Sequence, residues 1–284
     1  MSVKKNLFNV VKKIYILLPK IIPGYFGKRF REEVAEDLVV IDEVNTKYGK
    51  LKYYCLGWIP LWRSQTLFVK EPEMIEWIDG MKEDEILWDI GANVGLYSMY
   101  AGLKGMTVFA FEPSALNTFF ISKNIEINDL KDNVFLFPIA VSDKNEFGYL
   151  NMTSTAFGGA LNEFNKTDIE AVGEGQYQAN VIFKQGMFAY STDELIEKYG
   201  FEVPDYIKID VDSIEDRIVY GADKTLSHKK VKGIFLELDE TEERAQKLID
   251  FLADKGLKLK EKRQSPYFKD SKFNTQFNYI FERK

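Results

Sequence analysis

The sequence is poor in the residues that build disulfide frameworks and histidine metal sites. Its 284 residues include one cysteine and one histidine, and no apolar run is long enough to cross a bilayer. The lone Cys55 excludes an internal disulfide, which predicts a small core residue and a reducing, cytoplasmic location. The lone His228 excludes histidine-rich metal sites. Because two lysines follow His228 at the expected end of a helix, we interpret it as part of a solvated helix end.

Acidic residues are missing from the first 31 positions, although they dominate the rest of the chain. The net charge is −6, and removing the eight cations of the first 31 residues leaves −14 for residues 32–284. An acidic body excludes a nucleic-acid partner, because phosphate contacts need clustered cations. The length of the chain accommodates one domain with additions.

The basic N-terminal segment also has apolar residues at helical spacing. Its cations are Lys4, Lys5, Lys12, Lys13, Lys20, Lys28, Arg29 and Arg31, and its apolar positions are Leu7, Val10, Val11, Ile14, Leu17, Leu18, Ile21 and Ile22. The pattern predicts a basic amphipathic helix over residues 1–31 without the features of a signal peptide. Two interpretations stay open. The helix packs on the rest of the chain or on a second subunit of a homo-oligomer, or it lies peripherally on the anionic inner face of a membrane.

The most informative stretch is residues 86–95, where a short apolar run leads into a glycine turn and a helix-like run. Asp89 lies in the apolar run, and the turn contains Gly91, Asn93 and Gly95. Strand, glycine turn and helix together bring backbone N–H groups close to a ligand. A second run, residues 107–111, ends at Glu112, which lies 21 residues after Gly91, the distance typical of an acid that binds a ribose diol. The pair predicts a nucleoside cofactor at the carboxyl edge of a parallel sheet.

The residues around the turn distinguish between nucleoside cofactors. Asn93 stands where a dinucleotide fingerprint has its second glycine, and the Asp89 carboxylate would repel a pyrophosphate. The same carboxylate would attract the ammonium and sulfonium groups of S-adenosylmethionine, with Glu112 on the ribose. We therefore predict S-adenosylmethionine as the cofactor and keep a dinucleotide-dependent oxidoreductase as an alternative.

Alternating strand-like and helix-like segments predict an α/β protein with a mostly parallel sheet, helices on both faces and a C-terminal antiparallel hairpin. The predicted strands are residues 86–90, 107–111, 134–140, 206–211 and 233–238, and the hairpin pairs 257–262 with 277–283. A small region at residues 32–84, with strands at 51–56 and 66–69 and a helix at 72–80, precedes the main domain at residues 85–284. Residues 143–204 interrupt the alternation and predict an insertion that covers the site.

Four acids follow the last two parallel strands of the predicted sheet. Asp210 and Asp212 end one strand, and Glu237 and Asp239 end the next, so right-handed crossovers bring them to the edge that carries the glycine turn. Three interpretations stay open. Asp210, Glu237 and Asp239 hold a hard cation such as Mg²⁺, or the acids cap loops, or one carboxylate has a raised pKa and acts as general base. The candidates for that catalytic role are Asp210, Asp212, Glu215 and Glu237.

Several separated motifs occur in order between about residues 84 and 240. They are Trp88-Asp89-Ile90-Gly91-Ala92-Asn93-Val94-Gly95, Ala110-Phe111-Glu112-Pro113, Asn124 with Asn128, Ala140-Val141-Ser142-Asp143, Ile207-Lys208-Ile209-Asp210-Val211, Gly221-Ala222 and Leu236-Glu237. This set resembles the FkbM-type S-adenosylmethionine-dependent methyltransferases. The resemblance implies a Rossmann-like class I methyltransferase fold and O-methylation of a saccharide, glycan or glycolipid precursor, or of a polyketide-derived product. The predicted cofactor-binding residues are Asp89, Gly91, Ala92, Asn93, Gly95, Glu112, Pro113, Ser114, Asn117, Ala140, Val141, Ser142 and Asp210.

One position departs from the family pattern. After Lys-Ile-Asp-Val the family usually has Glu-Gly-x-Glu, whereas this chain has Asp212-Ser213-Ile214-Glu215. Serine replaces the glycine, which leaves a non-catalytic or carrier-binding module on the same fold as an alternative. Acceptor contacts are expected from the insertion and from the aromatic loop at residues 263–275, because aromatic faces suit sugar C–H surfaces. The residues expected there are Asn151, Asn162, Gln178, Tyr267, Phe268 and Phe273.

Overall fold

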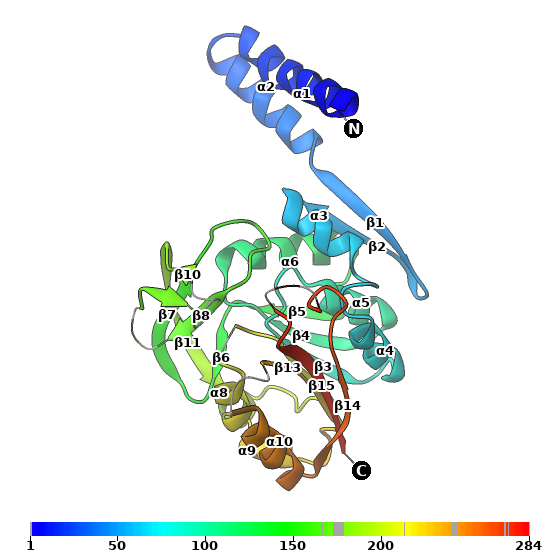
Figure 1. Ribbon diagram of the computed structural model, residues 1–284, viewed down its shortest axis with the longest axis vertical. Coiled ribbons are helices and arrows are strands. Elements are labelled where there is room, and N and C mark those ends of the chain that lie inside the picture. The colour runs from blue at the N-terminus through cyan, green and yellow to red at the C-terminus, as the bar shows by residue number, and fades with distance from the viewer. Residues whose placement is uncertain are drawn as a thin grey trace. The chain divides into compact units, whose positions relative to one another are not determined.

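The computed structural model describes residues 2–165, 167, 169–172, 179–212, 214–239, 244–269, 271 and 273–283. Contacts within the chain divide it into two units, Met1–Ile41 and Asp42–Lys284, and each is described by itself (Figure 1). Gln178 and Ser213, which the sequence singles out, lie outside the described residues.

The N-terminal unit has two helices where the sequence predicts one. Helix α1 is Ser2–Leu17, a 3-10 turn follows at Leu18–Ile21, and α2 is Gly24–Asp37. Pro23 separates them, because it has no N–H to continue the first helix and its extended backbone (ψ 163°) precedes the second. Helix α2 also continues past the predicted boundary at residue 31. The side chains of Arg29, before this boundary, and Glu33, after it, form an ion pair at 2.7 Å. In the described part of the chain, no helix combines the length and hydropathy that a bilayer crossing requires.

A seven-stranded sheet in the order β14-β15-β13-β12-β3-β4-β5 forms the centre of the second unit. The parallel strands are β3 (Ile86–Ile90), β4 (Thr107–Phe111), β5 (Val134–Phe137), β12 (Tyr206–Ile209) and β13 (Gly233–Asp239). The last two strands, β14 (Leu257–Arg263) and β15 (Gln276–Arg283), form an antiparallel hairpin, and β15 pairs antiparallel with β13. The predicted α/β class, the mostly parallel sheet and the C-terminal hairpin are confirmed.

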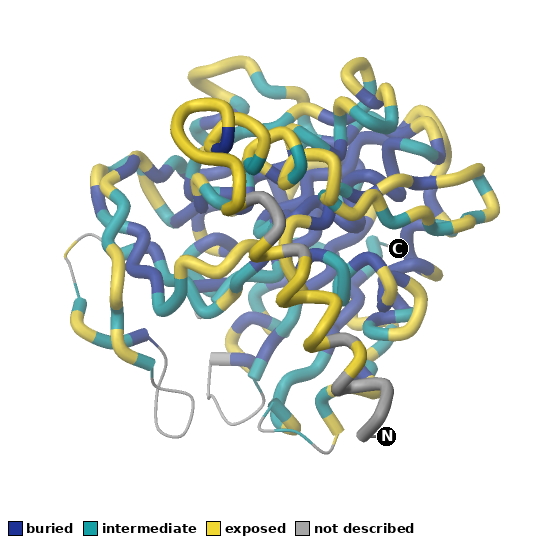
Figure 2. The backbone as a smooth tube through the Cα atoms, turned by 90° about the horizontal axis from the view of Figure 1, so that it is seen from above, coloured by how far each residue is buried: buried dark blue, intermediate teal, exposed yellow. Residues whose placement is uncertain are grey.

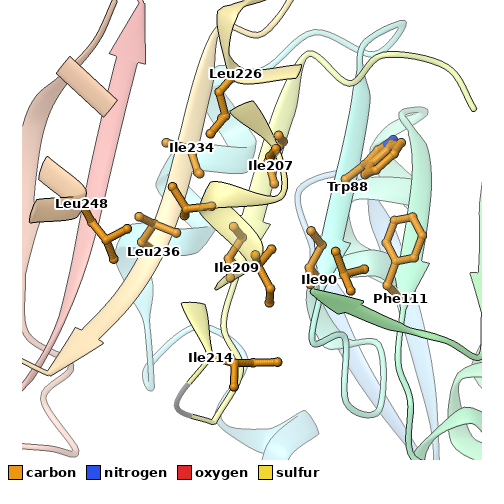
Figure 3. Packing of buried hydrophobic residues seen from close by; sticks show 14 of the residues in the cluster. Trp88, Ile90, Phe111, Ile207, Ile209, Ile214, Leu226, Ile234, Leu236 and Leu248 are labelled. Atoms are coloured by element: carbon orange, nitrogen blue, oxygen red, sulfur yellow. The ribbon is translucent and has the colours of Figure 1, made fainter. Parts of the chain in front are cut away.

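Alternate residues of the central strands supply two hydrophobic cores, one on each face of the sheet. In β3, Trp88 belongs to one core and Leu87 to the other. The first core packs the sheet against α8 (Glu215–Tyr220) and α10 (Arg244–Asp254), and Figure 3 shows Trp88, Ile209, Leu236 and Leu248 within it. The second packs the opposite face against α4 (Pro72–Gly80), α5 (Leu96–Lys104) and α6 (Ala115–Ile127). Helices therefore cover both faces, and the strands between them are buried (Figure 2).

The region before the sheet contains a helix that the sequence does not predict. Strands β1 (Val40–Thr46) and β2 (Gly49–Cys55) form a two-stranded sheet, and α3 (Trp58–Gln65) follows. The predicted strand at residues 66–69 is instead a turn that closes α3. The N–H and the hydroxyl of Thr66 both donate to the Trp62 carbonyl, at 3.0 and 2.9 Å, so Thr66 ends a helix and does not join a sheet ladder.

Two asparagines, Asn124 in α6 and Asn128 at its C-terminal cap, attach β2 to the main sheet. The Asn124 side chain accepts from the Tyr54 N–H and donates to the Val94 carbonyl, both at 2.8 Å. One turn later, Asn128 accepts from the Lys52 N–H at 2.8 Å and donates to the Lys52 carbonyl at 2.7 Å. The two amides take the place of a neighbouring strand along the edge of β2. Because Val94 belongs to the glycine turn, Asn124 also connects that turn to β2.

The insertion forms a sheet of its own, in the order β6-β11-β7-β8. These strands are β6 (Ala140–Ser142), β7 (Glu146–Met152), β8 (Asn162–Asn165) and β11 (Phe183–Ser191), and β9 (Ala171–Val172) pairs separately with β10 (Ala179–Asn180). The predicted strand at residues 134–140 is divided at Pro138, which has no N–H for a ladder, and β6 pairs with β11. The short helices α7 (Thr192–Glu197) and α9 (Asp223–Ser227) complete the unit.

Candidate active site

A cavity of about 330 Å³ lies at the carboxyl ends of β3, β4, β12 and β13. One set of lining residues comes from the glycine turn and the ends of β4 and β5: Ile90, Gly91, Asn93, Phe111, Glu112, Pro113, Asn117, Ile139, Ala140 and Val141. Another set comes from α3, the insertion, the acidic strand ends and the C-terminal loop, and includes Trp62, Arg63, Lys70, Asn162, Asp210, Asp212, Glu237, Phe268, Phe273 and Gln276. A volume of this size accommodates a small organic ligand.

The glycine turn packs directly on the end of the neighbouring strand. Gly91 has a φ of +81°, and a Cβ atom there would lie 2.0 Å from the Asp210 carbonyl oxygen. The N–H groups of Gly91 and Ala92 both donate to the Phe111 carbonyl, at 2.9 and 3.1 Å. Only glycine fits this backbone and this space. The turn is therefore held against β4 and β12, and its remaining surface faces the cavity.

Glu112 is buried at the end of β4 and organises two loops. Its carboxylate accepts from the Asn93 N–H at 2.7 Å and from the Ser114 N–H at 2.9 Å. Burial raises the pKa of Glu112 to about 7, although these two N–H groups act in the opposite direction. The Asn93 amide donates to the Gly159 carbonyl at 2.9 Å, and its Oδ1 atom is buried without a hydrogen-bond partner among the described residues. A cavity-lining acceptor of this kind suits a ligand that carries an N–H, ammonium or hydroxyl group.

Asp89 does not reach the cavity, contrary to the expectation that it binds the ammonium end of the cofactor. Its carboxylate is fully buried and accepts from Lys208 Nζ at 2.8 Å and from Ser98 Oγ at 2.5 Å. Lys208 also donates to the Gly91 carbonyl at 3.0 Å and lies 3.5 Å from Asp210. Burial lowers the pKa of Lys208, but Asp89 and Asp210 outweigh it, and the net shift is upward. Asp89 thus holds the lysine that fastens the turn to β12.

Three of the predicted acids, Asp210, Asp212 and Glu237, line the cavity, and their surroundings shift their pKa values in different directions. Burial raises the pKa of Asp210, but Lys208 and nearby cations outweigh it, so the net shift is downward. Burial raises the pKa of Asp212 to about 6, although the Asn162 N–H donates to its carboxylate at 2.8 Å. Burial and the neighbouring Asp210 charge raise the pKa of Glu237 well above its ordinary value. The site thus combines an ionised acid, Asp210, with two acids whose pKa values are raised by burial.

Lysines and an arginine, which sequence reasoning missed, offset the charge of these acids. Lys70 lines the cavity and lies 2.9 Å from Glu71, whose second oxygen accepts from the Tyr97 hydroxyl at 2.5 Å. Arg63 also lines the cavity and donates to the Gly158 carbonyl at 2.9 Å. No spacing in the sequence relates these residues to Asp210. Only Lys208 is marked by the sequence, because it stands in the Lys-Ile-Asp motif, but the motif alone does not indicate that its charge balances the acids.

The predicted metal ligands do not form a group. Asp210 and Glu237 line the cavity, whereas Asp239 is outside it and accepts from the Thr275 hydroxyl at 2.8 Å. Within the part of the chain that the structure describes, no group of three or more His, Cys, Asp or Glu side chains is arranged to hold a metal ion. The repulsion that suggested Mg²⁺ is balanced by Lys70, Lys208 and Arg63. The site therefore gives no support to a Mg²⁺ cofactor.

Aromatic side chains from α3 and the C-terminal loop form one wall of the cavity. Trp62 lies edge-on to Tyr267, with ring centres 6.0 Å apart, and Phe268 packs against Phe273 at 5.6 Å. Lys70 Nζ lies 5.4 Å from the centre of the Phe268 ring. Of the residues expected to contact the acceptor substrate, Asn162, Phe268 and Phe273 line the cavity. Asn151 is fully buried and its amide donates to backbone carbonyls, so it has a structural role.

The predicted site residues thus separate into two groups. Those that line the cavity are Gly91, Asn93, Glu112, Pro113, Asn117, Ala140, Val141, Asp210, Asp212 and Glu237. Those outside it are Asp89, Ala92, Gly95, Ser114, Ser142, Glu215 and Asp239. Ser142 of the second group has a structural role, because it is fully buried and donates to the Asp143 carboxylate at 3.0 Å.

The strand order, the glycine turn and the acid that ends the next strand define a Rossmann-like α/β protein with a ligand cavity at the carboxyl edge of its sheet. The model of the methyltransferase FkbM domain matches residues 89–259. The chain belongs to the FkbM methyltransferase family, as its motifs predicted.

Individual relatives are more distant. The hexuronic acid methyltransferase AglP of Haloferax volcanii is 24% identical over 166 residues, which span 58% of this chain and 62% of that protein. The structure of methyltransferase FkbM from Methylobacillus flagellatus aligns with a TM-score of 0.46 at 13% identity, over 70% of this chain and 44% of that one. Magnesium protoporphyrin IX methyltransferase from Synechocystis, solved with bound S-adenosylmethionine, aligns with a TM-score of 0.45 at 12% identity, over 80% and 82% of the two chains.

Proposed function

We propose that the chain is an S-adenosylmethionine-dependent O-methyltransferase that acts on a saccharide hydroxyl in a glycan or glycolipid precursor. The observation that supports this most is one continuous cavity. It brings the glycine turn and Glu112 together with Asp210, Asp212 and Glu237. A cofactor end and an acid–base end are both required for methyl transfer to a hydroxyl, and family membership agrees with this assignment.

The cofactor end fits a nucleoside that carries positive charge. Glu112 is placed to accept from ribose hydroxyls, and the unpartnered Asn93 Oδ1 is an acceptor for an ammonium or hydroxyl group. Ala140 and Val141 add apolar surface for a base. The ionised Asp210 carboxylate lines the cavity, and its negative charge can attract a positively charged group of the cofactor. When bound, S-adenosylmethionine supplies a methyl group attached to a sulfonium, which is an excellent leaving group.

The acid–base end has a residue suited to take the acceptor proton. The carboxyl of Asp212 has a pKa of about 6, so it is mostly deprotonated at neutral pH and is still basic enough to accept a proton. Asp212 would take the proton of the acceptor hydroxyl, and S-adenosylmethionine, when bound, would supply the methyl group to that oxygen. Lys70 and Arg63 balance the charge of the acids and orient polar groups of the acceptor. The chain supplies proximity, alignment and a base.

A saccharide acceptor is supported by the aromatic side chains that line the cavity together with these acids. Trp62 and Phe268 offer aromatic faces beside the carboxylates and the Asn162 amide, and this mixture suits the C–H faces and hydroxyl edges of a sugar. The name of the relative AglP, a hexuronic acid methyltransferase, agrees with this class of acceptor.

Transfer of labelled methyl from S-adenosylmethionine to a panel of oligosaccharides tests the proposal. The panel contains neutral hexose oligomers and uronic-acid oligomers, and an Asp212→Asn variant serves as the control for background transfer. We expect product with at least one saccharide class and its loss in the variant. Tight binding of the cofactor without methyl transfer to any member of the panel would instead support a non-catalytic, carrier-binding module.

A further inference from the structure

Helix α1 of the N-terminal unit carries an apolar stripe along one face. In α1, Leu7, Val10, Ile14 and Leu17 follow each other at intervals of three or four residues and so share one helix face. Between 54% and 64% of each side chain is exposed. A row of four exposed aliphatic residues is unusual on a surface that faces only water.

Cations border this stripe. Lys12 and Lys13 are exposed on α1, and Lys20 is exposed in the 3-10 turn that follows it. The basic run ends at Arg31, and acids begin at Glu32 in the second half of α2. Since the first 31 residues contain no acid, the charge of α1 and of the turn that follows it has a single sign, whereas the rest of the chain is acidic.

Aromatic residues continue the exposed surface where α2 begins. Tyr25 and Phe26 are 72% and 75% exposed, and their rings lie edge-on at 6.0 Å. Lys28 and Arg29 follow them after Gly27. Aliphatic residues that enter the acyl region, aromatic residues at its boundary and cations at the headgroups are the three features of a helix that lies in a membrane interface.

We propose that residues 7–31 dock on an anionic lipid bilayer as a peripheral, interfacial anchor. Charge disfavours pairing with the same helices of a second copy, and the aliphatic stripe favours a bilayer over an acidic protein face. A second copy would bring the same cations against these cations, and repulsion between them would oppose pairing. The bilayer offers both hydrocarbon for the stripe and negative charge for the lysines. The proposal concerns this surface alone and does not depend on the reaction at the cavity.

Vesicle flotation of the full chain tests the anchor. One set of vesicles is phosphatidylcholine alone, and the other is an equal mixture of phosphatidylcholine and phosphatidylglycerol. We expect the chain to float with the mixed vesicles, to float poorly with phosphatidylcholine, and to lose binding as salt is raised. A chain that stays unbound with the mixed vesicles at low salt overturns the proposal.

Two full-chain variants separate the contributions of the stripe and of the cations. Replacing Leu7, Val10 and Ile14 by serine removes the apolar contact and should abolish flotation. Replacing Lys12, Lys13 and Lys20 by glutamine should lower the partition coefficient about a hundredfold, since each cation near an anionic surface contributes about a factor of five. The matched control is Ile182→Ser with Phe188→Ser, which removes exposed apolar side chains from the insertion and should float like the unmodified chain.

The competing occupant gives a different result. If the stripe contacts a second copy, light scattering shows a dimer that the serine variant converts to a monomer, and the unmodified chain does not float. Equal flotation of the serine variant and the unmodified chain also contradicts the anchor. Circular dichroism and thermal unfolding of each variant show whether the α/β unit is intact, so a folding defect cannot be mistaken for lost binding.

Discussion

Asp210 and Asp212 lie two positions apart at the end of β12, but their carboxyl pKa values shift in opposite directions. Lys208 and nearby cations keep Asp210 ionised against the effect of burial, whereas burial raises the pKa of Asp212 to about 6. This difference assigns the two residues different tasks. In the proposed reaction, Asp210 supplies fixed negative charge and Asp212 exchanges the proton.

Substituting Asp212 by asparagine should lower kcat by about a hundredfold to ten-thousandfold, because a general base contributes about that much. In the unmodified enzyme, kcat/KM should fall about tenfold per pH unit below about pH 6, since protonated Asp212 cannot accept the acceptor proton. The variant should lose this pH dependence. Asp239→Asn, at the same sheet edge but outside the cavity, should keep most of the activity. Equal losses in both variants would contradict the assignment of the base.

Glu112 should make the affinity for S-adenosylmethionine depend on pH near neutrality. Its pKa is raised to about 7 by burial, and the ionised form is the better acceptor for ribose hydroxyls. The dissociation constant should therefore rise about tenfold per pH unit below about pH 7 as the carboxylate is protonated. In Glu112→Gln, calorimetry should find binding about tenfold to a hundredfold weaker and independent of pH from about 5.5 to about 8. A variant that keeps the full pH dependence would remove Glu112 from the cofactor site.

At the scale of elements, the glycine turn connects β3, β4 and β12 into one frame. Gly91→Ala should lower the free energy of unfolding by about 3 kcal/mol or more, because φ is positive there and the new Cβ meets the Asp210 carbonyl. Gly80→Ala is the matched control. No atom lies within 4 Å of a Cβ at Gly80, so its effect should stay within about 1 kcal/mol. Urea unfolding monitored by circular dichroism compares the two, and a Gly91 variant as stable as the control would contradict the packing described.

The Asn124 contact between α6, β2 and the turn is a second element-scale test. Asn124→Ala leaves the Tyr54 N–H and the Val94 carbonyl without their partner, so it should cost about 2 kcal/mol or more. Ser122→Ala, on the exposed side of the same helix, should change stability by less than about 0.5 kcal/mol. Thermal unfolding measures both. If the two variants unfold alike, Asn124 does not hold β2.

Sequence patterns predicted the elements whose signal is local. Strands β3 and β4 have the predicted bounds, because buried parallel strands are short continuous apolar runs. Helix α3 was missed because it has no side-chain cap at its start and contains Pro60 in its first turns. Pro138 divides a predicted strand because it has no N–H for a strand ladder. The apolar residues on both sides of Pro138 led to the prediction of one continuous strand.

Sequence patterns located the site residues that lie on strand ends and turns. They missed those whose contacts join side chains from distant parts of the sequence. Gly91 and Glu112, which line the cavity, could be predicted because strand ends and turns are recognisable from the order of the residues. Asp89 was assigned to the cofactor because its partner, Lys208, is 119 residues away and no local pattern relates the two. Lys70 was missed for the same reason. Charge balance in a cavity is a tertiary property, and the metal hypothesis arose from counting acids without these cations.

At the scale of the whole molecule, the fold makes the cavity the meeting point of four segments: the glycine turn, the acidic strand ends, the insertion and the C-terminal loop. Each segment alone is short. Their convergence at the carboxyl edge of the sheet follows from right-handed crossovers between parallel strands. The N-terminal unit adds a surface of opposite charge, so one chain contains an acidic catalytic candidate and a basic anchor candidate.

The most direct test of the central claim is calorimetric titration of the full chain with S-adenosylmethionine and, separately, with NAD. The account predicts saturable binding of S-adenosylmethionine at one site per chain, weakened in Glu112→Gln, and no binding of NAD. Binding of NAD without binding of S-adenosylmethionine would contradict the account and return the cavity to the dinucleotide class.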